Sequence, residues 1–137
     1  IMTFFEEYIQ ASRGLVFVAT TRDNQPSIRI MGFAVSPERE NLWYFNVDPT
    51  SYKVHDIDNN DKVAIITPFN ENGARIESNN ATMRRSDKTW ADVKPLFIDN
   101  KSYMQGHPDI ENEIVLELHI HSASLASYGY KKDVNFE

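Results

Sequence analysis

Hydrophobic and polar positions along this chain fall into short runs that predict several β-strands and few helices. The clearest strand covers residues 113–121, where apolar side chains alternate with Glu113, Glu117, His119 and His121. Runs rich in β-branched and aromatic residues predict further strands at residues 15–21, 27–35, 42–47, 62–67, 74–83 and 124–130. The strand at 27–35 is apolar on both faces, so we expect it to be central in a sheet. The strand at 42–47 is two-sided in the same way.

Three helical segments are predicted between these strands. Apolar residues at helical spacing predict an amphipathic helix over residues 2–13, which Gly14 ends. Thr50 or Ser51 can cap a short helix that runs through about Ile57 and turns Val54 and Ile57 toward the core. A third stretch is capped by Ser86-Asp87, split in two by Pro95, and ended by residues 106–108.

The connections between strands favour hairpins. Residues 23–26 form one predicted turn, and Asn72-Gly73 is a strong hairpin signal. Six or seven short strands joined in this way predict a mainly β fold, a small closed barrel with short helices. The chain has 137 residues, which suits a single domain over residues 1–137. Because several strands lack a polar face, we expect a homodimer to cover them.

Charge and composition narrow the classes of partner. The net charge of −6 disfavours binding to nucleic acid or an anionic membrane surface. No apolar run approaches the roughly 20 residues that a membrane-spanning helix needs. The chain has no cysteine, which excludes disulfides, thiolate metal ligands and cysteine nucleophiles. That composition is typical of a cytoplasmic protein, and the first residues do not resemble a signal peptide.

Arg29 is the first candidate for chemistry, because it lies inside an otherwise apolar strand. An arginine among large apolar groups must reach solvent, an acid or an anionic ligand. One interpretation is that its charged end reaches solvent or pairs with a local carboxylate such as Glu77. The other is bidentate capture of a phosphate, which suits its planar guanidinium.

Lys53 is the second candidate, because a cation in the first turn of a helix opposes the helix dipole. A solvated surface lysine is the simpler interpretation. Together with Thr50, Ser51 and the helix N-terminus, however, Lys53 could form a phosphate cradle. The loop has no glycine, so it is not a Walker or dinucleotide-binding motif.

Other residues point to chemistry less clearly. Most of the aromatic set Trp43, Tyr44, Phe45 and Tyr52 is expected in the core, although some could wall a flat ring system. His119 and His121 could share a metal, but the polar face of an amphipathic strand is the favoured account, and we expect no metal site. His55 and His107 look like surface or turn residues, and no signature of Ser-His-Asp catalysis is present.

The chain resembles the FMN-binding split-barrel proteins that are similar to pyridoxamine 5'-phosphate oxidase. The resemblance rests on the order LVFVATT, DNQPSIRIMGFAV, LWYFNV, TSYKVHDIDNN and KVAIITP, and it covers roughly residues 1 to 130. It implies that Arg29 and Lys53 bind the FMN phosphate. It also implies a homodimer with FMN at the subunit interface, in which the following residues complete the site: Ile30, Met31 and Gly32 along the isoalloxazine, and Phe45, Asn46, Ser51 and Tyr52 around it.

The same resemblance implies a flavin-mediated redox reaction on an unidentified small molecule, with Arg29 and Lys53 as anchors rather than acid–base groups. No residue stands out as a proton donor. The chain lacks the extended C-terminus that carries substrate-phosphate contacts in true pyridoxamine phosphate oxidases, which argues against vitamin B6 oxidation. The alternatives are a non-catalytic flavin-binding protein for storage or sensing, a barrel without a ligand, and a related split barrel that binds haem or a deazaflavin.

Overall fold

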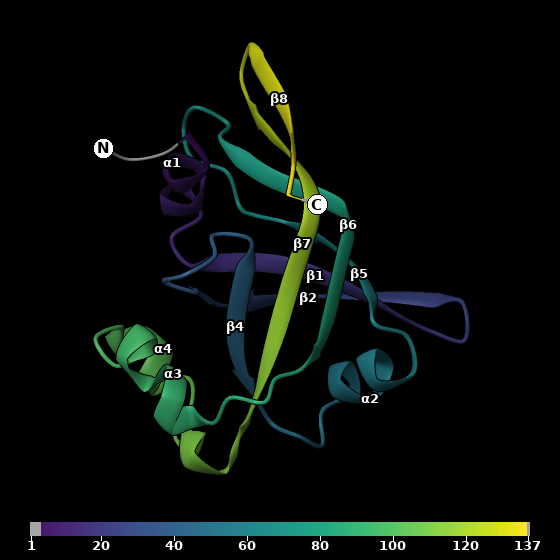
Figure 1. Cartoon of the computed structure of the whole chain (residues 1–137), viewed down its shortest axis with the longest axis vertical. Helices are drawn as coiled ribbons and strands as arrows, with labels where there is room; N and C mark the ends of the chain where they lie inside the picture. The colour runs from purple at the N-terminus through teal and green to yellow at the C-terminus, as the bar shows by residue number, and fades with distance from the viewer. Residues whose placement is uncertain (1–3, 137) are drawn as a thin grey trace.

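The computed structural model describes residues 4–136 and consists mainly of one curled antiparallel sheet (Figure 1). The strand order is β2-β1-β5-β6-β7-β4-β3, and β8 pairs with β7 outside this path. The predicted class, a mainly β split barrel, is confirmed. The strands are β1 (Leu15–Arg22), β2 (Gln25–Gly32), β3 (Ala34–Val35), β4 (Leu42–Val47), β5 (Lys62–Ile66), β6 (Arg75–Arg85), β7 (Ile114–Ser127) and β8 (Tyr130–Asn135).

Phe33 links two strands that lie at opposite ends of the strand order. The predicted strand at 27–35 divides here, because β2 pairs with β1 whereas β3 pairs with β4. Phe33 is buried and stacks on Trp43, with the two ring centroids 3.9 Å apart. This connection therefore brings the two ends of the curled sheet together.

β2 is an edge strand, so the expectation that it is central is wrong. It forms one end of the strand order, and Ile28 and Ile30 on its outer face are 65% and 50% exposed. Its inner face reaches the core through the buried Met31. The two-sided apolar pattern therefore reflects one buried face and one apolar face that this chain leaves uncovered.

A two-residue turn sets the register between β1 and β2. Asp23 and Asn24 have φ angles of 50° and 67°, which the tight hairpin turns of type I′ require. β2 consequently begins at Gln25, inside the predicted turn. In this register Val18 lies opposite Arg29, next to the strand positions of Thr20 and Ser27.

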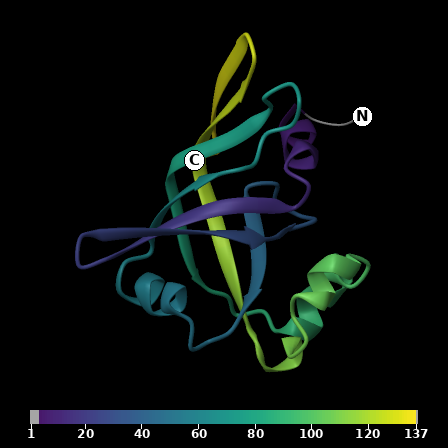
Figure 2. The same ribbon diagram turned by 180° about the vertical axis from the view of Figure 1, so that it is seen from behind.

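β4 lies between two apolar clusters, which confirms its two-sided pattern. All six of its residues are buried. Trp43 and Phe45 belong to the main core inside the barrel, whereas Leu42 and Tyr44 belong to a second cluster with residues of the helices α3 (Trp90–Phe97) and α4 (Lys101–Gln105). Figures 1 and 2 show these helices beside β4, away from the other helices.

The boundaries of α3 and α4 correct two predictions. The N-cap of α3 is Thr89 rather than Ser86-Asp87, and the Asp92 carboxylate accepts a hydrogen bond from the Thr89 backbone N–H at 2.8 Å. Pro95 lies inside α3 and does not split it. The break follows Phe97, and α4 restarts where the Asn100 side chain accepts a hydrogen bond from the Tyr103 N–H.

One long strand, β7, replaces the two predicted strands at 113–121 and 124–130. It continues through Ser122 because β6 pairs with it on one side and β8 on the other. The turn that does occur lies at Tyr128-Gly129, where Gly129 has a φ of 77°, and it leads into β8. The β7–β8 hairpin projects from the barrel in both ribbon views (Figures 1 and 2).

The remaining helices agree with the predictions. α1 spans Phe4–Ala11, and residues 2 and 3 of the predicted helix lie outside the described residues. α2 spans Tyr52–Asn59 with Ser51 at its N-cap, and it packs on β1 and β6 through the buried Val54 and Ile57. A single 3₁₀ turn, η1 (Ile110–Asn112), precedes β7. No helix within residues 4–136 is long and apolar enough to cross a membrane.

Candidate functional site

Arg29 and Lys53 come from β2 and α2 and are near enough to interact electrostatically. Burial lowers the pKa of Lys53, and the positive charge of Arg29 lowers it further. The acids Asp48 and Glu113 oppose this shift but do not cancel it. The Lys53 side chain forms no ion pair or hydrogen bond with any residue in the range 4–136. Its ammonium group is therefore only partly compensated by the surrounding charges.

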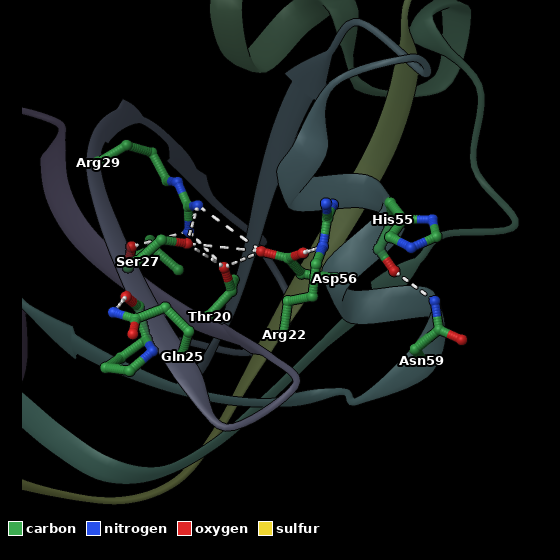
Figure 3. Close-up of polar contacts among 10 residues, drawn as sticks. Thr20, Arg22, Gln25, Ser27, Arg29, His55, Asp56 and Asn59 are labelled. Carbon is green, nitrogen blue, oxygen red and sulfur yellow. Dashed lines mark hydrogen bonds and ion pairs between the residues drawn. The ribbon is translucent and has the colours of Figure 1, made fainter.

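Arg29 is held in place by β1 and by its own strand. Its guanidinium donates hydrogen bonds to Thr20 Oγ1 at 2.7 Å, Ser27 Oγ at 2.8 Å and the Val18 carbonyl at 3.2 Å. Figure 3 shows Arg29, Ser27 and Thr20 converging, with Asp56 beside Thr20. Burial lowers the pKa of Arg29, and the charge of Asp56 partly offsets that effect. The guanidinium is therefore fixed in position before any ligand binds.

Asp56 is the acid that pairs with Arg29, rather than Glu77 as the sequence suggested. Its Oδ2 lies 3.9 Å from Arg29 Nη2, and its Oδ1 accepts a 2.9 Å hydrogen bond from Arg22 Nε. Asp56 is only 3% exposed. Burial raises the pKa of this carboxyl, but the hydrogen bonds from Thr20 and Arg22 and the nearby cations outweigh burial, so the net pKa is lowered.

The N-terminus of α2 differs in part from the predicted cradle. The hydroxyl of Thr50 donates to Asp48 Oδ1, and that of Ser51 donates to the Asp48 carbonyl, each at 2.8 Å. These two hydroxyls stabilise the turn before the helix, and Ser51 makes no side-chain cap bond. Among the first four backbone N–H groups of α2, those of Val54 and His55 donate to the Ser51 carbonyl, which leaves those of Tyr52 and Lys53 without an acceptor within the helix. Lys53 and the free amides remain as the groups that attract an anion.

A pocket of about 280 Å³ joins five of the nine predicted site residues. Its lining combines the end of β2, the end of β4, Lys53 of α2, and residues on either side of η1. The lining residues are Ile30, Met31, Gly32, Asn46, Val47, Asp48, Lys53, Gly106, His107 and Glu113.

The other four predicted residues do not line this pocket. Arg29 is coupled to it through Lys53. Phe45 is fully buried in the barrel core, where the sequence interpretation as a core aromatic holds. Ser51 bonds to the preceding turn, and the exposed Tyr52 ring stacks under the Arg22 guanidinium at 5.0 Å.

Asn46 carries an unsatisfied acceptor in this pocket. Its side chain is 2% exposed, and its Nδ2 donates to the Tyr103 hydroxyl at 3.2 Å. Its Oδ1 has no hydrogen-bond partner within the described part of the chain. An unpaired buried carbonyl is costly, so a ligand that donates an N–H or O–H group to Oδ1 would be stabilised.

His107 lines the pocket and Tyr103 supports its lining, and neither residue was predicted. The Tyr103 hydroxyl accepts the Asn46 backbone N–H at 3.1 Å, and burial raises the pKa of the phenol. The His107 ring stacks on the Tyr103 ring with centroids 4.2 Å apart. Gly32 allows this arrangement, because a Cβ atom there would lie 2.8 Å from the Tyr103 ring. The aromatic periodicity of residues 97–107 was the only available signal, and it does not specify the partner strand.

The two histidines on β7 differ in their surroundings. His119 Nε2 lies 3.2 Å from Glu117 Oε1 but makes no hydrogen bond to a described residue, whereas His121 Nε2 lies 3.1 Å from the Thr82 hydroxyl, within hydrogen-bond distance. Within residues 4–136 no group of three or more His, Cys, Asp or Glu side chains is arranged to hold a metal ion.

Comparison with known proteins places the fold and the sequence in context. A family profile described as pyridoxamine 5'-phosphate oxidase-like matches residues 9–130. No functionally curated protein matches the chain.

Three solved structures illustrate the similarity. A Clostridium acetobutylicum protein related to general stress protein 26 of Bacillus subtilis shares 14% identity over 97% of this chain and 94% of its own, with a TM-score of 0.72. A pyridoxamine 5'-phosphate oxidase-related, FMN-binding protein from Nostoc punctiforme shares 13% over 96% and 93%, with a TM-score of 0.62. A haem-binding protein from Mycobacterium smegmatis shares 14% over 98% of this chain and 59% of its own, with a TM-score of 0.72.

Proposed function

The chain belongs to the pyridoxamine 5'-phosphate oxidase-like family, and we propose that it is an FMN-binding oxidoreductase whose flavin reduces or oxidises a small molecule. The FMN phosphate binds between Arg29 and Lys53. Ile30, Met31 and Gly32 lie along the ring system, and Asn46 contacts its polar edge. Bound FMN supplies hydride and electron transfer, whereas the residues of the chain bind and orient it.

The observation that carries this proposal is that one pocket contains both an unpaired cation and an unpaired buried hydrogen-bond acceptor. Lys53 is a cation without an ion pair among the described residues, and Asn46 presents a buried acceptor without a donor. A ligand with an anionic group at one end and a hydrogen-bond donor at the other could bind both groups. FMN is such a ligand, since it combines a phosphate with a ring that carries an N–H group.

The preset position of Arg29 supports the phosphate assignment. Charge-assisted hydrogen bonds are strong when the donor is already oriented, because less conformational entropy is lost on binding. Arg29 is oriented by Thr20 and Ser27. The negative charge of Asp56 beside it is balanced by the ion pair of Asp56 with Arg22. The guanidinium and the Lys53 ammonium thus remain available to an additional anion.

We also propose a homodimer with FMN at its interface. The pocket of one chain, about 280 Å³, lies just below the range of roughly 300–1,000 Å³ for small-molecule sites. Ile30 lines the pocket, and Ile28 lies beside it on the exposed outer face of β2. A second copy that covers this apolar face would also close the site.

Haem binding is a second candidate, favoured by one specific observation. His107 lines the pocket, and its Nδ1 is hydrogen-bonded to Glu113. Histidines that bind metals commonly have their second ring nitrogen fixed in this way. A haem-binding structure is also among the similar folds.

Titration of the purified protein with FMN, riboflavin and haemin tests these proposals. We expect FMN to bind, with quenching of the flavin fluorescence. Riboflavin, which lacks the phosphate, should bind at least about tenfold more weakly. Equal affinity for FMN and riboflavin would contradict the phosphate site. A Soret band with haemin and no flavin binding would favour the second candidate.

A further inference from the structure

His107 and Glu113 form a close carboxylate–imidazole pair at the pocket. His107 Nδ1 lies 2.7 Å from Glu113 Oε1. A carboxylate that accepts the Nδ1–H bond keeps a neutral imidazole in the tautomer whose Nε2 carries a free lone pair. The two residues flank η1, so the turn itself brings them together.

The ring of His107 is held in one orientation. It stacks on Tyr103 with an interplanar angle of 18°, and Tyr103 in turn stacks on Phe97 of α3. Nε2 of His107 makes no hydrogen bond to any residue in the described range. One ring nitrogen is thus anchored and the other has no hydrogen-bond partner among the described residues, and His107 lines the pocket together with Lys53 and Asn46.

The charged and titratable groups around His107 favour a proton-transfer role. Glu113 before β7, Lys53 of α2 and Asp48 after β4 line the same pocket, and Tyr103 of α4 lies against the ring. Burial raises the pKa of Tyr103, so that phenol stays neutral. Imidazole is the side chain best suited to proton transfer near neutral pH, and Glu113 would balance the imidazolium.

Nucleophilic catalysis is not supported by the same arrangement. The lining residues of this pocket include no serine, threonine or cysteine, so the carboxylate–imidazole pair has no nucleophile to activate there. Asn46 Oδ1 and His107 Nε2 are instead two acceptors in one pocket. These two acceptors would bind a ligand that carries O–H or N–H donors at the end remote from its anionic group.

We infer that His107, oriented by Glu113, is the acid–base residue of this pocket and exchanges a proton through Nε2 with an O–H or N–H group of the bound molecule. In the forward direction the O–H or N–H bond breaks, its electron pair stays on the ligand atom, and the proton joins Nε2. The reverse step returns it. This inference rests on the proposed flavin site, and it adds the proton-transfer residue that sequence analysis did not find.

Modification with diethyl pyrocarbonate tests the position of His107 without any turnover. The reagent acylates an accessible, unprotonated imidazole nitrogen, and mass spectrometry reports each histidine separately. With free FMN at about ten times its Kd, His107 should react about tenfold more slowly, because only about a tenth of the sites are empty. His55, exposed on α2 and outside the pocket, is the internal control and should react at the same rate with and without FMN.

Turnover tests the acid–base role itself, with NADPH as reductant and menadione as acceptor. We expect His107→Ala to lower kcat roughly 100-fold, with less change in FMN affinity, and added imidazole to restore part of the rate. Glu113→Gln keeps a hydrogen-bond acceptor but removes the charge, so its kcat should lie between those of the wild-type protein and His107→Ala. His55→Ala should behave like the wild-type protein.

The outcomes separate the two proposals. Equal reactivity of His107 with and without bound FMN overturns this inference and leaves the flavin site intact. So does a flavin-loaded wild-type protein without turnover, or an His107→Ala variant that imidazole does not rescue. A wild-type protein that does not bind FMN overturns the proposed function, and this inference with it.

Discussion

Thr20 donates its hydroxyl hydrogen to Asp56 across 2.8 Å, and this bond joins the barrel wall to α2. The same hydroxyl oxygen accepts a hydrogen bond from Arg29 at 2.7 Å. A buried carboxylate on the helix therefore fixes, through one threonine, the guanidinium that we assign to phosphate binding. The helix that carries Lys53 is held to the strand that carries Arg29 by the same contact, so both cations are positioned together.

Replacement of Asp56 by Asn should lower stability and its dependence on pH. Removing one partner of a buried ion pair costs about 3 kcal/mol, near the lower limit here because Arg22 is partly exposed. The pKa of Asp56 is lowered in the folded state, so its contribution is complete above the unfolded value of about 3.9 and is lost as the pH falls through the folded value. Thermal unfolding from pH 7 to pH 3 should show a steeper fall for the wild-type protein than for Asp56→Asn.

Asp58→Asn is the matched control for that experiment. Asp58 also lies on α2, but it pairs with Arg85 at the surface, 3.0 Å away. Surface pairs contribute little to stability. A loss in Asp58→Asn as large as that in Asp56→Asn would contradict the role given to the buried network.

Arg29→Ala and Lys53→Ala should each weaken FMN binding by about tenfold or more. Charged hydrogen bonds to phosphate contribute about 1.5–3 kcal/mol each, which corresponds to that range. Fluorescence titration of FMN measures the effect, and Lys62→Ala, at an exposed lysine on β5 outside the pocket, serves as the control. Unchanged affinity in both Arg29→Ala and Lys53→Ala would rule out this phosphate site.

Local patterns single out the two cations because each stands out within its own segment, and their binding of a phosphate stays a prediction. Arg29 interrupts an apolar strand, and Lys53 opposes a helix dipole. Asp56 was missed although a signal existed: it lies three residues after Lys53 and between Val54 and Ile57 on the buried face of α2. An acid on that face needs cationic partners, and Arg29 could have been matched to it.

Tyr103 was beyond the reach of local patterns, because it contacts Asn46 and Gly32, which lie more than 50 residues earlier in the chain. His107 bonds to Glu113 only six residues away, but it stacks on Tyr103, whose position no local pattern indicates. The edge position of β2 was mispredicted for a related reason. Apolar residues on both faces indicate burial on both faces, and a sequence does not say whether the second cover comes from the same chain.

FMN binding should weaken at alkaline pH because of Lys53. Burial and the charge of Arg29 lower the pKa of this lysine, so it loses its proton at a lower pH than an exposed lysine. The FMN phosphate is already fully ionised in this range and does not compensate. Affinity measured from pH 7.5 to pH 10 should fall for the wild-type protein and stay nearly level for Lys53→Arg, which keeps its charge. Parallel profiles for the two proteins would contradict the assignment.

Gly32→Ala should disturb the pocket through Tyr103. The new methyl group would meet the Tyr103 ring at 2.8 Å and push it away from Asn46, at a cost of about 1–3 kcal/mol for overpacking. Both the FMN affinity and the free energy of unfolding should fall in this variant. Gly106→Ala is the control, since its nearest heavy atom would lie at an ordinary 3.5 Å. Equal behaviour of the two variants in thermal unfolding would show that the Gly32–Tyr103 contact has no special role.

Ile28→Lys should convert the proposed dimer into a monomer and weaken FMN binding. Ile28 is 65% exposed on the outer face of β2, so a lysine there is solvated in a monomer but would be buried without a partner in the dimer. The substitution leaves the barrel core untouched, so the unfolding temperature of the monomer should remain close to that of the wild-type chain. Ile98→Lys, at an exposed isoleucine after α3, is the matched control and should remain dimeric. Light scattering distinguishes the outcomes. A wild-type monomer would contradict the proposed dimer and leave FMN to be held by the residues of one chain, whereas an Ile28→Lys variant that stays dimeric would contradict the location of the interface at β2.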